Sequence, residues 1–99
     1  MEKSLIVEKH RRLKELQKEL AGLGPVMRGS VVVIGTRNKQ PYFSLNKDKK
    51  TKLIYLGKKR ESLAKAYSEN YKRLLEIVEE MTEINMELVK NDASNTPST

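Results

Sequence analysis

The residues with the clearest chemical capacity are lysines and arginines concentrated in the middle third of the chain. Residues 28–60 hold ten basic side chains and one acidic one, Asp48, so this segment carries +9 within a chain of +7. Basic side chains neutralise phosphates and release condensed counterions, which makes a polyanion the expected ligand. The predicted nucleic-acid-binding residues are Arg37, Lys39, Tyr42, Lys47, Lys49, Lys50, Lys52, Lys58, Lys59 and Arg60.

The same lysines also have a purely structural interpretation, because lysine often guards the exposed edge of a sheet against pairing with another chain. The confinement of the charge to one third of the chain favours the binding interpretation. Aromatic rings interleaved with these lysines would add stacking on bases. Phe43 is expected in the core, whereas Tyr42 and Tyr55 are each compatible with core and surface.

Catalytic chemistry is not expected from this residue set. The chain has no cysteine, and its single histidine, His10, lies among basic neighbours and is expected at the surface. No serine is accompanied by a suitably placed histidine. The carboxylates of the last third are expected to be solvated on one helix face, at Glu76, Glu79, Glu80, Glu83 and Glu87. We therefore expect a protein that is not an enzyme and has no catalytic residue, cofactor or metal site.

A first helix is predicted over residues 4–22, before the basic segment. Its apolar positions step by three and four residues, as on one helix face. These positions are Ile6, Leu13, Leu16, Leu20 and Leu23. The Gly-Leu-Gly-Pro sequence at 22–25 ends the helix, because glycine suits a left-handed cap and proline cannot continue the hydrogen-bond ladder.

Residues 29–56 are predicted to form a three-stranded antiparallel meander. The β-branched run at 31–34 favours a strand over a helix. Further strand patterns at 42–45 and 51–56 are separated by short polar turns. A sheet of this size needs a cover over one apolar face, and the flanking helices are the available cover.

A second, long helix is predicted over residues 59–90. Its apolar seam is expected at Tyr67, Tyr71, Leu74, Val78, Met81, Asn85 and Leu88. The polar member, Asn85, either fixes register as a buried polar residue or is solvent-exposed because the seam ends near Met81.

The fold class is therefore α+β, with one domain over residues 1–90 and a polar tail over 91–99 that is expected to be disordered. The two helices are expected to pack as an antiparallel coiled-coil stalk, with Ile6 to Leu20 against Leu74 to Leu88. The same seams are also able to pair between two chains.

Several segments resemble a family of uncharacterised prokaryotic proteins with the same order of helix, three strands and long helix. The resemblance rests on residues 27–30, 41–45 and 69–89, with the pairs Asn70-Tyr71 and Ile84-Asn85 as its most specific part. Many members carry a cysteine-containing insertion between the first two strands that looks like a metal knuckle. Residues 36–40 hold no cysteine here. The resemblance thus implies a fold, and neither a metal nor an activity.

The strand and helix portion also resembles the three-stranded arm-binding domains of phage-type integrases, which place a sheet in a DNA groove. DNA is expected as the partner ahead of RNA, and RNA stays open because no residue pattern here distinguishes the two. We expect a nucleic-acid-binding accessory or regulatory protein. The alternative is a coiled-coil protein–protein adaptor with a basic head. A homodimer or a helical protein partner is compatible with either hypothesis.

The N-terminal apolar run is only three residues long, too short for a signal peptide or a membrane span. We therefore expect no membrane association and a cytoplasmic location.

Overall fold

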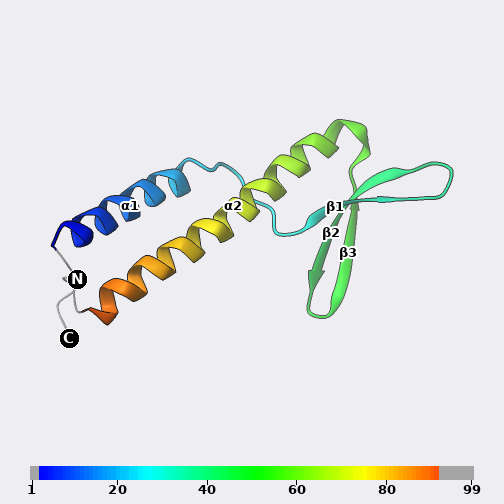
Figure 1. The fold of residues 1–99 in the computed structure, drawn as a ribbon. Helices are drawn as coiled ribbons and strands as arrows, with labels where there is room; N and C mark the ends of the chain where they lie inside the picture. The colour runs from blue at the N-terminus through cyan, green and yellow to red at the C-terminus, as the bar shows by residue number, and fades with distance from the viewer. Residues whose placement is uncertain (1–2, 92–99) are drawn as a thin grey trace. The chain divides into compact units, whose positions relative to one another are not determined.

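The computed structural model describes residues 3–91, which form two helices and three strands (Figure 1). In chain order the elements are α1 (Lys3–Ala21), β1 (Ser30–Ile34), β2 (Gln40–Lys47), β3 (Lys50–Tyr55) and α2 (Gly57–Lys90). The predicted α+β fold is confirmed, and the expected bounds of both helices and of the sheet agree with these within two residues. The tail predicted to be disordered lies outside the described residues, except for Asn91.

The chain divides into two compact units that share α2. The sheet unit, residues 24–73, contains the linker after α1, the three strands and the N-terminal half of α2. The helix-pair unit consists of α1 and the C-terminal half of α2, beginning at Leu74. The expectation of a single domain over residues 1–90 stays a prediction.

The sheet is an antiparallel meander in the order β1-β2-β3. Phe43 on β2 is paired with Val31 on β1 and with Ile54 on β3. Directly paired residues lie on the same face of a sheet and successive residues alternate between faces, so these three side chains share one face.

This face carries the core of the sheet unit. Phe43 is 3% exposed and clusters with buried Leu56 and Ala64, so the sheet packs against the start of α2. Met27 and Leu45 pack around this cluster. The prediction that Phe43 belongs to the core is confirmed.

The linker that leads into β1 is bound to α2 by side chains of the helix. The buried Ser68 hydroxyl donates to the Gly29 carbonyl at 2.7 Å, and the Asn70 amide donates to the Pro25 carbonyl at 2.8 Å. Backbone outside a helix or sheet has no regular hydrogen-bond partners, and these two bonds supply partners for the linker carbonyls.

Gly29 lies where the linker passes over the phenyl ring of the core. A Cβ atom at this position would come within 2.6 Å of the Phe43 ring and 2.5 Å of the Ser44 carbonyl oxygen. Only glycine therefore fits between the linker and the buried ring without displacing one of them.

In the helix-pair unit, α1 runs antiparallel beside the C-terminal half of α2 (Figure 1). Leu16 on α1 and Ile77 and Leu88 on α2 are at most 1% exposed. The described residues of the predicted seam on α1 are all partly or fully buried. That the two helices pack as a coiled coil stays a prediction.

The predicted seam on α2 is wrong at two positions. Val78 is 47% exposed and Asn85 is exposed, whereas the preceding Ile77 is fully buried and Ile84 is partly buried. The predicted row advances by four residues from Leu74 to Val78 and then by three. The observed row advances by three residues from Leu74 to Ile77 and then by four. The two rows share Leu74, Met81 and Leu88, and the buried one includes the two isoleucines, which remove more apolar area from water than Val78 and Asn85 would. Of the two alternatives for Asn85, the structure agrees with the solvent-exposed one, although the buried row continues beyond Met81.

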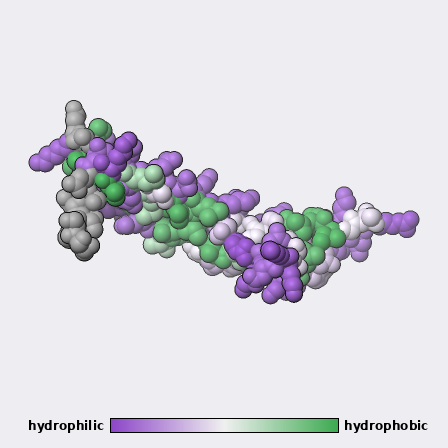
Figure 2. Space-filling model, turned by 90° about the horizontal axis from the view of Figure 1, so that it is seen from below, coloured by the Kyte–Doolittle hydropathy of each residue, from purple (hydrophilic) through white to green (hydrophobic). Residues whose placement is uncertain are grey.

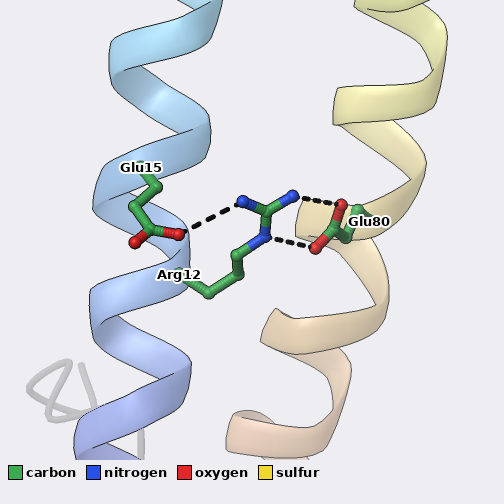
Figure 3. A network of polar contacts seen from close by, with 3 residues as sticks. All are labelled: Arg12, Glu15 and Glu80. Atoms are coloured by element: carbon green, nitrogen blue, oxygen red, sulfur yellow. Dashed lines mark hydrogen bonds and ion pairs between the residues drawn. The ribbon is translucent and has the colours of Figure 1, made fainter.

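One polar network connects the two helices of this unit (Figure 3). The Arg12 guanidinium donates from Nε and Nη2 to the two carboxylate oxygens of Glu80, at 2.6 and 3.0 Å, and from Nη1 to Glu15 at 3.2 Å. The hydrogen bonds to Glu80, and then to Glu15, raise the pKa of Arg12 further above its ordinary value. This two-point contact places Arg12 of α1 beside Glu80 of α2. The placement agrees with the expected alignment of Ile6 to Leu20 against Leu74 to Leu88.

Replacing Phe43 by alanine is expected to lower the free energy of unfolding by about 3–5 kcal/mol, because it removes a buried ring and leaves a cavity. Leu53→Ala is the matched control, since Leu53 is 50% exposed on the opposite face of the sheet. The control should change stability by less than about 1 kcal/mol. Circular dichroism melting of both variants makes the comparison, and equal losses would contradict the placement of the core.

Candidate nucleic-acid interface

All ten residues of the predicted interface lie in the sheet unit, and its nine basic side chains gather at three places. Arg37 and Lys39 lie in the turn between β1 and β2. Lys47, Lys49, Lys50 and Lys52 surround the β2–β3 hairpin turn. The first turn of α2 carries Lys58, Lys59 and Arg60. All nine are exposed.

The positive charge of this region is not compensated by ion pairs among the described residues. Within residues 3–91, none of the ten basic residues of segment 28–60 forms an ion pair. The acidic neighbours on α2 are engaged elsewhere, Glu61 with Lys65 at 3.1 Å and Glu69 with Lys72 at 3.2 Å.

The two units carry charges of opposite sign. Residues 24–73 contain thirteen basic and three acidic residues, a charge of +10, and the remainder of the chain carries −3. Within that remainder residues 1–23 carry +2 and residues 74–99 carry −5, so the change of sign falls at the unit boundary on α2.

The strand lysines and the tyrosines lie on opposite faces of the sheet. Lys52 is paired with Leu45, and Lys47 with Lys50, so these lysines share the face of Phe43 at the hairpin end. Tyr42 and Tyr55 are paired with each other and belong to the other face. The lysines of the strands and the tyrosine pair are therefore presented on different faces of the sheet. Residues 43, 45 and 47 are alternate positions of β2, and alternate residues of a strand point to the same face of the sheet.

The outward face presents an exposed aromatic pair. The rings of Tyr42 and Tyr55 meet edge to face, with centroids 5.5 Å apart and planes at 68°. Tyr42 is half-buried and Tyr55 is 49% exposed. The Tyr55 hydroxyl donates to the Gln40 side-chain oxygen at 3.1 Å, which further orients the ring.

Tyr55 was not among the predicted interface residues. Its direct pairing with Tyr42 identifies Tyr55 as part of the same surface. That pairing depends on the register of the strands, which the sequence alone does not give. Leu53 lies next to the pair on the same face, so apolar surface is exposed there as well. Figure 2 shows hydrophobic side chains at the protein surface.

The hairpin turn holds Lys49 in a backbone conformation that lysine rarely adopts. Asp48 and Lys49 have φ values of 53° and 62°, and two such residues form the type I′ turn typical of two-residue hairpins. Glycine or asparagine is preferred at these positions, and a residue with a Cβ atom costs about 1 kcal/mol there. Folding alone therefore does not favour a lysine at position 49.

The first turn of α2 also carries positive charge where helix stability favours negative charge. This turn contains no acidic residue, and the N-terminus of a helix is the positive end of its dipole. Arg60 has a structural role, because its guanidinium donates to the carbonyls of Leu56 at 2.8 Å and Tyr55 at 3.2 Å. Lys58 and Lys59 are exposed and oppose the dipole.

Other candidate sites are not supported among residues 3–91. No three histidine, cysteine, aspartate or glutamate side chains in this part of the chain are grouped to hold a metal ion. His10, expected at the surface, is half-buried, and its Nε2 atom is buried without a hydrogen-bond partner. Neither of the two described helices is both long and apolar enough to cross a membrane.

No family model, curated protein or solved structure shows significant similarity to this chain. The resemblances to a prokaryotic family and to integrase arm-binding domains are therefore not supported. The element order that the first resemblance implied is nevertheless the order observed.

Lys49→Gly should raise the free energy of unfolding by about 0.5–1 kcal/mol, because glycine adopts the positive φ of the turn without a Cβ penalty. Lys50→Gly provides the control, since Lys50 belongs to β3 and glycine weakens a strand. Chemical denaturation of both variants measures the difference, and a destabilised Lys49→Gly variant would contradict the assigned turn.

Proposed function

We propose that this protein is an accessory or regulatory protein that binds nucleic acid, with DNA preferred over RNA, through its sheet unit. The observation that carries the proposal is the uncompensated charge: ten basic side chains between residues 28 and 60 form no ion pair within the described residues. Phosphates of a nucleic acid would supply the missing negative partners and release counterions on contact.

Two groups of these lysines are placed where folding does not favour them. Lys49 lies in a left-handed turn position, and Lys58 and Lys59 lie at the positive end of a helix dipole. Lysines that only prevented edge-to-edge pairing of strands would not be needed at a turn or on a helix. Their positions are better explained by an anionic ligand than by stability.

The outward face of the sheet supplies the second type of contact. Tyr42 and Tyr55 present ring surface away from the core, and the nearby Gln40 and Ser44 present polar atoms on the same face. The major groove of B-DNA, about 12 Å wide, admits a β-ribbon, whereas the major groove of A-form RNA is too narrow for side-chain access. This difference in groove width supports DNA as the preferred partner.

The protein–protein adaptor hypothesis has its own observation. Apolar side chains of the C-terminal half of α2, such as Val78 and Met86, are exposed and lie outside the sheet unit. An adaptor would bind a partner there and would not require the basic sheet. Titration with nucleic acid separates the two functions, because the adaptor hypothesis expects no binding even at low salt.

Affinity for duplex DNA should depend strongly on salt. If five to eight basic side chains meet phosphates, the logarithm of the binding constant should fall against the logarithm of salt concentration with a slope of about −4 to −7. Fluorescence anisotropy with duplex DNA, single-stranded DNA and duplex RNA measures this slope. A slope near zero, or no binding to any of the three at low salt, would sink the proposal.

The position of the charge, not only its amount, should decide affinity. Lys47, Lys49 and Lys50 replaced together by glutamine should reduce the magnitude of the salt slope by about 3, because each lost phosphate contact contributes about 0.9. The matched control replaces Lys65, Lys72 and Lys90 by glutamine, which changes the net charge equally outside the predicted interface. Similar losses in both triple variants would show that binding follows net charge alone.

A further inference from the structure

The outward face of the sheet, on which the tyrosine pair lies, carries no charged side chain. Directly paired residues share a face, so the strand register assigns ten residues to it. We call them the neutral face, and they are Ser30, Val32, Ile34, Gln40, Tyr42, Ser44, Asn46, Thr51, Leu53 and Tyr55. The cations of segment 28–60 therefore lie around this face and not on it.

The ten basic residues of this segment divide equally between the two ends of the strands. Consecutive turns of a meander lie at opposite ends. α2 begins at the end that holds the β1–β2 turn, where the Leu56 amide donates to the Pro41 carbonyl at 3.1 Å. This helix end carries Arg37, Lys39, Lys58, Lys59 and Arg60. The hairpin end carries Arg28, Lys47, Lys49, Lys50 and Lys52. A ligand on the neutral face would thus meet positive charge at both ends of the strands and none between them.

The dimensions of the sheet fit the major groove of DNA. Three strands spaced by about 4.8 Å place the outer two roughly 10 Å apart, within a groove about 12 Å wide. The minor groove, about 6 Å wide, is too narrow for this face. β2 extends from Gln40 to Lys47, roughly 23 Å, which corresponds to at most about seven base pairs at a rise of 3.4 Å each. The neutral face would then lie over base edges, and the basic ends would meet the backbones where the sheet leaves the curving groove.

Two polar groups on the neutral face, toward the hairpin end, have no partner within residues 3–91. The Thr51 hydroxyl donates to the Asn46 side-chain oxygen at 2.7 Å, which orients the amide and leaves its Nδ2 donor without a hydrogen bond among the described residues. The Ser44 hydroxyl has none in this part of the chain either. Because Ser44 and Asn46 are alternate residues of β2, both groups point outward, side by side. The face thus presents an oriented donor beside a hydroxyl that can donate or accept.

Base edges in the major groove offer the missing partners. Guanine, adenine and thymine each present acceptors there, whereas cytosine presents an amino donor. The Asn46 donor therefore discriminates between bases at its position. Leu53, which is 50% exposed and paired with Ser44, adds apolar surface for a thymine methyl group. Phosphate contacts carry no sequence information of this kind.

We propose that the neutral face reads base edges in the major groove, so that binding is sequence-specific and Asn46 and Ser44 are specificity-determining residues. The inference rests on the proposed function and adds recognition of a base sequence to it. The basic ends supply affinity for any duplex, and the neutral face supplies the preference for one. Thr51 is a positioning residue, because it orients the Asn46 amide.

Selection by the full chain from duplexes with ten randomised base pairs tests the sequence preference. The chain should enrich a motif of at most about seven base pairs. Fluorescence anisotropy should then show affinity for the enriched duplex at least about thirtyfold higher than for a duplex with the same base pairs in permuted order, because each mismatched pair lowers affinity by about tenfold. Equal affinity for the two duplexes would overturn the inference and leave the proposed function intact. No binding to either duplex at low salt would overturn both.

Variants on the neutral face separate base recognition from a structural role. Asn46→Ala and Ser44→Ala should each lower affinity for the enriched duplex by about tenfold, and leave the permuted duplex and the salt slope unchanged because no charge is removed. Thr51→Val should act in the same way, whereas Thr51→Ser keeps the hydroxyl and should retain discrimination. Gln17→Ala is the control, since it removes an exposed amide of the helix-pair unit and should change neither affinity. Equal weakening of both duplexes by Asn46→Ala would reveal a structural role alone and overturn the inference.

Discussion

Burial of the Phe43 ring between the sheet and α2 is the contact on which the sheet unit depends. Three short strands do not hold together in water without a covered apolar face, and among residues 3–91 this is the one fully buried aromatic ring. Because side chains alternate along β2, placing residue 43 inward places Tyr42 outward. The same alternation sends Lys47 to the opposite side from the tyrosines. One packing contact thus determines which groups the sheet can offer to a ligand.

The two units distribute stability and charge differently. The sheet unit has a small core, and its ten lysines and arginines between residues 28 and 60 form no ion pair within the described residues. The helix-pair unit has a longer buried row and the Arg12 network between its helices. Exposed ion pairs contribute little to folding, so the apolar row provides most of the stability there and Arg12 chiefly specifies alignment. The uncompensated positive charge is therefore concentrated in the sheet unit, around the Phe43 cluster.

Local sequence patterns were sufficient for the elements and for the identity of the central ring. The valine run, the glycine and proline after the first helix, and the alternation around Phe43 each depend on neighbours within a few residues. The frame of the seam on α2 was not predictable in this way, because Ile77 and Val78 fit the three-four stepping equally well. The hydrogen bonds from Ser68 and Asn70 to the linker join residues 39 and 45 positions apart, which no short pattern reveals. The positive φ of Lys49 was also unpredicted, since the residues of that turn do not include the expected glycine.

The bonds between the linker and α2 have a consequence for the order in which the chain folds. The β2–β3 hairpin closes a two-residue turn and can form as soon as it leaves the ribosome, within microseconds. The linker before β1 has no hydrogen-bond donors from Ser68 and Asn70 until synthesis has passed residue 70. During translation of about fifteen residues, roughly one to three seconds at typical rates, Phe43 therefore stays uncovered and the hairpin forms only transiently. The lysines around its turn keep that nascent intermediate soluble by mutual repulsion, whatever they bind later.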